Sequence, residues 1–114
     1  MGLPQTQFGL RSASLPDRLL KLPPRIFNPN RIRIMLALYN VVGADFTELR
    51  GKLGLSDGAL ATYLKALVKD ELVTTEQDHT GNREKTVYMI TRKGLQTMDE
   101  LVEVFGSIKE EISQ

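Results

Sequence analysis

The sequence contains no cysteine and only one histidine. The absence of cysteine excludes disulfides, iron–sulfur clusters, thiol nucleophiles and zinc fingers. A single histidine and the lack of clustered carboxylates leave no acid–base or metal constellation for catalysis. No apolar run is long enough for a signal peptide or for a membrane span of about 20 residues. We therefore expect a cytoplasmic protein that is not an enzyme, binds no metal or other cofactor and has no membrane partner.

Charge is present but unevenly distributed. The 114 residues, enough for one domain, carry a formal net charge of +1. Residues 1–93 contain 14 lysines and arginines against 9 acidic residues, whereas residues 94–114 contain one lysine and five acidic residues. A polyanion should therefore meet the body of the molecule and not its C-terminal segment.

The first part of the sequence predicts an arm and then a helix. Prolines punctuate the arm, residues 1–27, in which a short helix is expected over residues 17–22. The regular body begins at Asn28, a good N-cap residue, with Pro29 at the first helical position. We expect a largely buried helix from there to about Gly43, because apolar residues recur at helical spacing. These residues are Ile32, Ile34, Met35, Leu36, Leu38, Tyr39, Val41 and Val42.

Two further helices are predicted in close succession. Asp45 and Glu48 have the spacing of a capping box, which predicts a helix over residues 46–53. Gly54 is placed to end that helix with a positive φ, and Ser56 is placed to cap the next, which runs to about Lys69. The buried side of this next helix should carry Leu60, Leu64 and Leu67. Two helices joined by so short a glycine-containing turn have the spacing of a helix-turn-helix.

A hairpin and a long helix complete the chain. Residues 72–77 and 85–90 are rich in Val, Thr and Tyr and predict two strands, joined by a polar loop over residues 78–84. Thr91 should cap a last helix over residues 92–112. Its apolar residues recur every three or four positions: Leu95, Met98, Leu101, Val102, Phe105, Ile108 and Ile112.

This order of elements predicts a mainly α fold with a small β-hairpin wing (α+β), a winged helix-turn-helix. The stretches LGLSDGAL at residues 53–60, YLKALVKDELV at 63–73 and GNREKTVYMIT at 81–91 carry a family resemblance. Residues 30–100 resemble small prokaryotic, especially archaeal, winged-helix transcriptional regulators related to the MarR and ArsR families. The resemblance implies dimeric binding to double-stranded DNA. We divide the chain into an N-terminal arm (1–27), partly disordered or packed on a partner, a DNA-binding domain (28–93) and a C-terminal dimerisation helix (94–114).

The helix over residues 57–69 is the candidate recognition helix, which would lie in the major groove. Its expected outer face carries small or neutral residues but no Arg, Asn or Gln, so we expect modest base specificity or recognition of DNA shape. Asp57 could accept from cytosine, while Ala59 and Thr62 could contact a thymine methyl group. Alternatively, these are ordinary solvent-facing residues. The candidate contacts are Ser56, Asp57, Gly58, Ala59, Thr62, Tyr63 and Lys65.

The hairpin loop is the second candidate contact. It carries Asn82, Arg83 and Lys85, and an arginine on a protruding loop suits insertion into a narrow minor groove. His79 is a weaker candidate there. A solvated hairpin tip commonly carries the same residue types, so this alternative stays open.

Other basic side chains lie at helix ends. Arg31 and Arg33 at the start of the first long helix could touch the DNA backbone, but an ion pair with a nearby acid is an equal alternative. Arg92 and Lys93 oppose the dipole of the last helix, which would be explained if they lay near phosphates.

The last helix should form a homodimer, because a domain this small cannot cover its apolar side over the whole length, from Leu101 to Ile112 in particular. The candidate dimer residues are the seven apolar positions named above, and two such helices could pack antiparallel or crossing. The alternative function is a protein–protein interaction module in a larger assembly. The operator and any small-molecule effector are not readable from the sequence.

Overall fold

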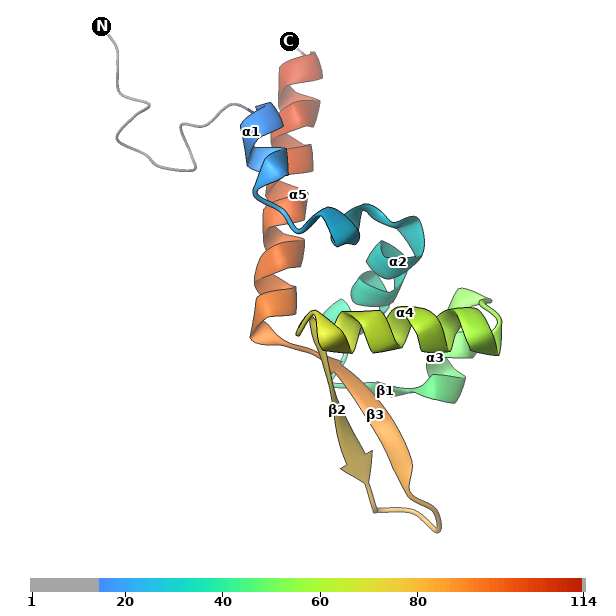
Figure 1. Cartoon of the computed structure of the whole chain (residues 1–114). Helices are drawn as coiled ribbons and strands as arrows, with labels where there is room; N and C mark the ends of the chain where they lie inside the picture. The colour runs from blue at the N-terminus through green and yellow to red at the C-terminus, as the bar shows by residue number, and fades with distance from the viewer. Residues whose placement is uncertain (1–14, 114) are drawn as a thin grey trace, which may run out of the picture.

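A computed structural model describes residues 15–113, so the first half of the predicted arm lies outside the described residues. The long helix α5 (Arg92–Ser113) runs along one side of the molecule (Figure 1). The other helices gather beside its N-terminal half, the hairpin projects beyond its N-terminal end, and α1 (Leu15–Leu20) lies against its C-terminal half.

The N-terminal segment forms α1, the 3-10 helix η2 (Pro24–Phe27) and α2 (Pro29–Tyr39). The short helix begins and ends two residues earlier than predicted. The predicted cap is confirmed, because the Asn28 side-chain oxygen accepts hydrogen bonds from the backbone N–H groups of Asn30 (2.9 Å) and Arg31 (3.2 Å).

The predicted extension of α2 to Gly43 is wrong. The helix ends at Tyr39, and its C-cap is Asn40. Leu36 and Val42, which were expected to be buried, are 54% and 94% exposed. The chain turns here because Ala44 and Asp45 form a short strand, β1, which the sequence pattern does not predict.

The new strand pairs with β3 (Lys85–Ile90), with Ala44 opposite Tyr88 and Asp45 opposite Val87. Gly43 permits the approach, since a Cβ at this position would lie 2.5 Å from Cγ1 of Val87. β3 also pairs with β2 (Val73–Asp78), so the wing is part of a three-stranded antiparallel sheet in the order β1-β3-β2.

The two central helices form as predicted. The helix α3 (Phe46–Leu53) begins with a complete capping box, in which the N–H of Glu48 donates to Asp45 (2.8 Å) and the N–H of Asp45 donates to Glu48 (2.9 Å). The helix α4 (Asp57–Lys69) follows after a three-residue turn. Thr91 caps α5 by accepting from the N–H of Gly94 (2.9 Å).

One hydrophobic core joins α2, α3, α4, the base of the wing and the first half of α5. Its fully buried side chains include Ile26, Ile34, Met35, Leu38, Leu49, Leu60, Leu64, Leu67, Leu72 and Met98. The core therefore holds α4 on one side and leaves its opposite side available for contact.

Helix α1 extends this packing along α5. Arg18, only 7% exposed, forms ion pairs with Glu103 (2.5 Å) and Glu100 (3.3 Å) on α5. Leu101 and Val104 are buried within the chain. The expectation that α5 needs a partner from Leu101 onward is therefore too broad. Val104 was missed, although it lies three positions after Leu101 and four before Ile108.

Candidate nucleic-acid interface

The turn before α4 has the predicted geometry. Gly54 adopts φ 66°, and its N–H donates to the carbonyl of Arg50 (2.9 Å). Ser56 Oγ accepts from the N–H of Ala59 (3.2 Å). The first N–H groups of α4, including those of Asp57 and Gly58, have no acceptor within the helix, as at any helix start. The start of α4 thus presents small residues and free N–H groups on the surface.

The open face of α4 is rotated relative to the predicted one. Ser56, Asp57, Gly58, Thr62 and Lys65 are exposed as expected, whereas Ala59 is half-buried. Ala61, Val68 and Lys69 are also exposed and were missed. Their spacing along the helix, opposite the buried Leu60, Leu64 and Leu67, was the signal that could have found them.

Tyr63 faces α2 rather than solvent. It is half-buried, packs against the core, and its hydroxyl accepts from the side-chain amide of Asn30 (3.3 Å). This hydrogen bond is the main cause that lowers the pKa of Tyr63, and the side chain of Asn28 adds to it. Tyr63 therefore supports the position of α4 and is a poor candidate for reading bases.

Two polar side chains on the open face already have partners. The Asp57 carboxylate pairs with Arg50 of α3 (2.9 Å), and the Thr62 hydroxyl donates to the carbonyl of Gly58 (2.8 Å). The hydroxyl oxygen and methyl group of Thr62 can still meet a base edge. Lys65 forms no ion pair with any residue from 15 to 113.

The wing loop is ordered by local hydrogen bonds at its first residue. The Asp78 carboxylate accepts from the hydroxyl (2.6 Å) and the N–H (2.9 Å) of Thr80, and these bonds lower the pKa of Asp78. His79 lies 3.3 Å from Glu84, a partner that the sequence pattern did not indicate.

The predicted contact residues of the wing differ in whether they already have a partner within the chain. Lys85, at the loop end of β3, lies 3.5 Å from Asp45, so the wing is tied to the start of α3. Asn82 and Arg83 are exposed and have no hydrogen bond or ion pair within the described part of the chain. Together with Asp45, Phe46 and Thr47, the loop lines a hollow of about 750 Å³ between the wing and α3.

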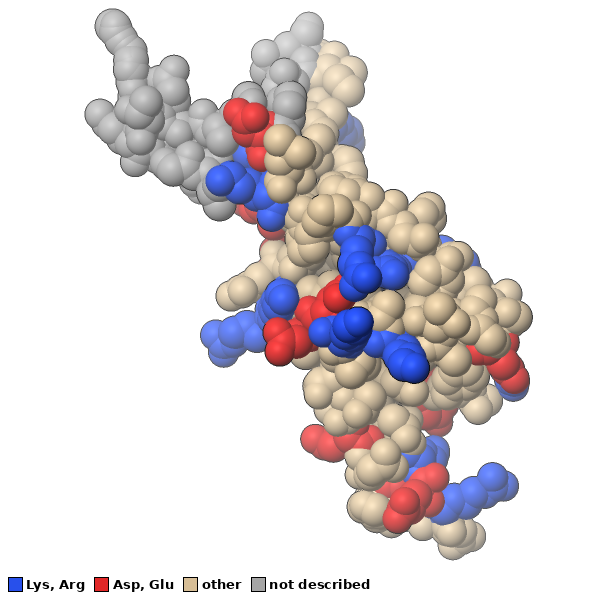
Figure 2. All heavy atoms as spheres, in the orientation of Figure 1, with Lys and Arg blue, Asp and Glu red and all other residues tan. Residues whose placement is uncertain are grey.

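Several other basic side chains form ion pairs or hydrogen bonds within the chain. Arg31 lies 3.7 Å from Asp70, and Arg33 donates to Asn30 (3.1 Å) and to the carbonyl of Leu53. Lys93 contacts the carbonyl of Asp70 (3.1 Å). Figure 2 shows Lys and Arg gathered over the middle of this face and again at the wing, with Asp and Glu among them. The positive charge available to DNA is therefore concentrated at few points.

The predicted dimer residues on α5 separate into two groups. Met98 and Leu101 belong to the core of the chain. Phe105 and Ile112 are 48% and 77% exposed, Ile108 is half-buried, and Leu95 and Val102 are also exposed.

Beside Val102, Leu36 and Tyr39 of α2 line a shallow groove, in which the Tyr39 hydroxyl donates to Asp99. This hydrogen bond, more than the charge of Asp99, raises the pKa of Tyr39.

Among residues 15–113 no helix is long and apolar enough to cross a membrane. In the same range no three His, Asp or Glu side chains come close enough together to hold a metal ion.

Comparison with solved structures supports the fold. A transcriptional regulator homologue from Pyrococcus horikoshii OT3 has a TM-score of 0.71 and 25% identity, over 78% of this chain and 88% of that one. MarR has a TM-score of 0.63 and 19% identity, over 74% of this chain and 61% of MarR, a likeness of fold alone.

Sequence comparison identifies the family. An uncharacterized protein of Methanocaldococcus jannaschii, MJ0432, is 38% identical over 71 residues, which are 61% of this chain and 77% of that protein. A family model described as a winged helix DNA-binding domain matches residues 30–108, more than half of the chain. The chain belongs to the winged helix DNA-binding domain family.

Proposed function

We propose that this protein is a transcriptional regulator that binds double-stranded DNA as a homodimer. The observation that carries the proposal is the start of α4, where small exposed residues and free N–H groups follow a glycine turn beside the wing that carries Arg83. Its family is one of DNA-binding proteins and not of enzymes. Because its ligand is chromosomal DNA, we place its action in the cytoplasm.

On DNA, α4 would enter the major groove and the wing would reach the adjacent minor groove. Gly58, Ala61 and Thr62 permit close approach and offer methyl contacts. Lys65 and Arg83 would supply charge, while the pairing of Asp57 with Arg50 keeps the Asp57 carboxylate from repelling the phosphates. This distribution supports recognition that depends on shape and apolar contact more than on bidentate hydrogen bonds.

The homodimer would form through the exposed apolar residues in the second half of α5. The wing projects beyond the N-terminal end of α5 (Figure 1). If two α5 helices packed antiparallel, the two wings would point in opposite directions and would meet a duplex at opposite ends of the dimer. A crossing in which both helices run the same way would leave both wings on one side, and either arrangement is compatible with one duplex.

Size-exclusion chromatography with light scattering, run with and without a palindromic duplex, tests this proposal. We expect a mass of two 12.8 kDa chains for the free protein and of two chains plus one duplex for the complex. A monomer that binds no duplex would refute both parts of the proposal.

A protein-interaction role is the second candidate. The observation that favours it is the pairing of Arg50 with Asp57 and of Lys85 with Asp45, which leaves few unpaired cations on the expected DNA face. Binding to random duplex DNA separates the two roles, because binding driven by phosphate contacts weakens steeply with added salt.

A further inference from the structure

The C-terminal end of α4 has an uncommon backbone conformation. Asp70 is the C-cap and Glu71 has φ 65°, a left-handed conformation that glycine usually supplies at this position. The N–H of Glu71 donates to Val68 (3.0 Å) and that of Leu72 donates to Leu67 (3.0 Å), which is the pattern of a Schellman motif. A residue other than glycine keeps this backbone conformation where the surrounding structure holds it in place.

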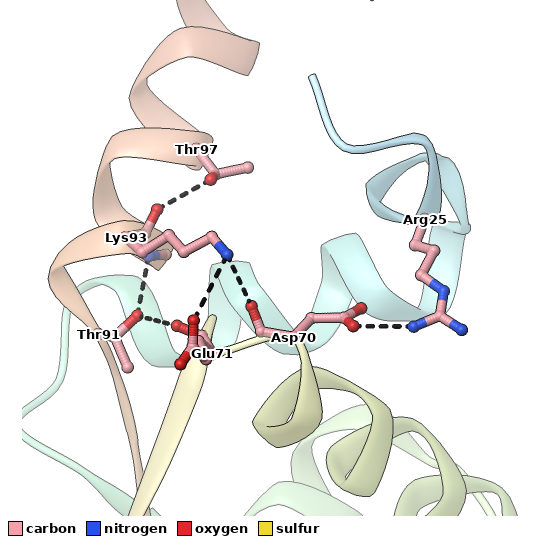
Figure 3. Close-up of polar contacts among 7 residues, drawn as sticks. Arg25, Asp70, Glu71, Thr91, Lys93 and Thr97 are labelled. Atoms are coloured by element: carbon pink, nitrogen blue, oxygen red, sulfur yellow. Dashed lines mark hydrogen bonds and ion pairs between the residues drawn. The ribbon is translucent and has the colours of Figure 1, made fainter. Parts of the chain in front are cut away.

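Basic side chains from two other elements lie beside the Asp70 carboxylate. Arg25 of η2 lies 2.8 Å from it and Arg31 of α2 lies 3.7 Å from it. A third cation, Lys93 of α5, donates to the backbone carbonyl of Asp70 (3.1 Å). Figure 3 shows Arg25 and Lys93 reaching Asp70 from opposite sides. The Asp70 side chain therefore contacts η2 and α2, while its backbone carbonyl contacts α5.

The next two residues attach the same point to the start of α5. The Glu71 carbonyl accepts from the Thr91 hydroxyl (2.7 Å), and the Leu72 carbonyl accepts from the Thr91 N–H (3.1 Å). Gly94 packs so closely that a Cβ there would overlap the carbonyl oxygen of Leu72. We call residues 70–72 and 91–94 the α4–α5 junction.

We propose that Asp70 is a positioning residue for DNA binding. Its carboxylate ties the end of α4 to η2 and α2 and in this way sets the direction in which α4 meets α5 at the α4–α5 junction. The inference rests on the proposed function. In a dimer held by α5, the separation of the two α4 helices depends on the angle at which each leaves its own α5. Two grooves of one duplex accept a narrow range of separations, so a change at the junction reduces affinity for the preferred site.

The sign of the effect distinguishes positioning from electrostatics. The change Asp70→Asn removes a negative charge from the body of the protein, which by charge alone strengthens binding to any duplex. If α4 loses its position, binding to the preferred duplex weakens instead. Binding to random DNA stays almost the same, because it depends on non-specific phosphate contacts. The two causes therefore act in opposite directions on the preferred duplex.

The test compares Asp70→Asn with Glu76→Gln, a control with the same charge change outside the α4–α5 junction. Glu76 is exposed on β2 and forms no ion pair with any residue from 15 to 113. The duplexes are a preferred sequence selected from a random library and a random sequence of equal length. We expect Asp70→Asn to lower affinity for the preferred duplex about tenfold and to keep its affinity for the random one. Glu76→Gln should bind both as the wild type does or more tightly, and Asp70→Glu should recover part of the affinity.

Other outcomes overturn the inference. It fails if Asp70→Asn binds the preferred duplex as tightly as Glu76→Gln does, or if its affinity for both duplexes falls equally along with thermal stability. If Asp70→Asn does not fold, Arg25→Lys tests the same contact with the charge kept, at a side chain 56% exposed. It should show a smaller decrease confined to the preferred duplex, and equal binding of both proteins contradicts positioning. A wild-type protein that binds no duplex rejects the proposed function instead.

Discussion

At the scale of single residues, local rules predicted the caps well. The capping box of α3 and the caps at Asn28, Ser56 and Thr91 all depend on neighbours within three positions, and each is present. Tyr63 was expected on the outer face of α4, but it is half-buried, and its hydroxyl accepts from Asn30, 33 positions away. Sequence reasoning therefore succeeds where the partner is local and fails where a distant helix supplies it.

Gly94 provides a residue-scale prediction of stability. In Gly94→Ala the new methyl group would overlap the backbone carbonyl of Leu72, which cannot rotate away as a side chain could. We expect the free energy of unfolding, measured in urea, to fall by about 1–3 kcal/mol. The control is Gly51→Ala on α3, where a Cβ meets nothing within 4 Å. It should be more stable than the wild type by about 0.5–1 kcal/mol, and equal effects of the two changes would contradict the close packing at Gly94.

At the scale of elements, the helix-turn-helix was predictable because glycine and serine mark its turn directly. The bounds of α3 and α4 match the predicted ones. The end of α2 was not predictable in this way, since Val41 and Val42 continue its apolar pattern. The helix stops because the following residues pair with β3, and a two-residue strand leaves no periodic signal in the sequence.

Ser56 tests the importance of the α4 start. Ser56→Ala removes the acceptor for the N–H of Ala59 and should lower the free energy of unfolding by about 1 kcal/mol. Affinity for duplex DNA should fall as well if this helix end meets a phosphate. The control is Ser113→Ala, whose hydroxyl donates to the carbonyl of Lys109 and caps no helix start. An unchanged melting temperature and unchanged affinity in Ser56→Ala would count against both roles.

At the scale of the whole molecule, the long last helix was predicted but the contacts along it were not. The sequence showed its apolar side, and the structure shows that α1 also packs on this helix, where Arg18 pairs with Glu100 and Glu103. The contacts of Asp70 could not have been predicted either, because Arg25, Asp70 and Lys93 are far apart in the sequence. The surface left for a partner is the stripe that includes Phe105 and Ile112.

This stripe predicts the effect of a charge on oligomeric state. Phe105→Glu would place a carboxylate in the proposed contact between two α5 helices, where burial without a partner is costly. Light scattering should then give the mass of one chain. Val42→Glu, at a side chain that is 94% exposed near the end of α2, should leave the dimer intact. If the Phe105→Glu variant still dimerises with the wild-type dissociation constant, another surface holds the two chains together.

The central claim is that α4 and the wing bind duplex DNA, and the salt dependence of affinity tests it most directly. Affinity for a random duplex should fall linearly with salt on logarithmic axes. In Arg83→Ala the slope should shrink by roughly 2 per dimer, at about 0.9 for each phosphate that the arginine no longer neutralises. Lys109→Ala, which removes the same charge from the second half of α5, should keep the wild-type slope. A wild-type protein with no measurable affinity, or an Arg83→Ala variant with unchanged affinity and slope, would contradict the account.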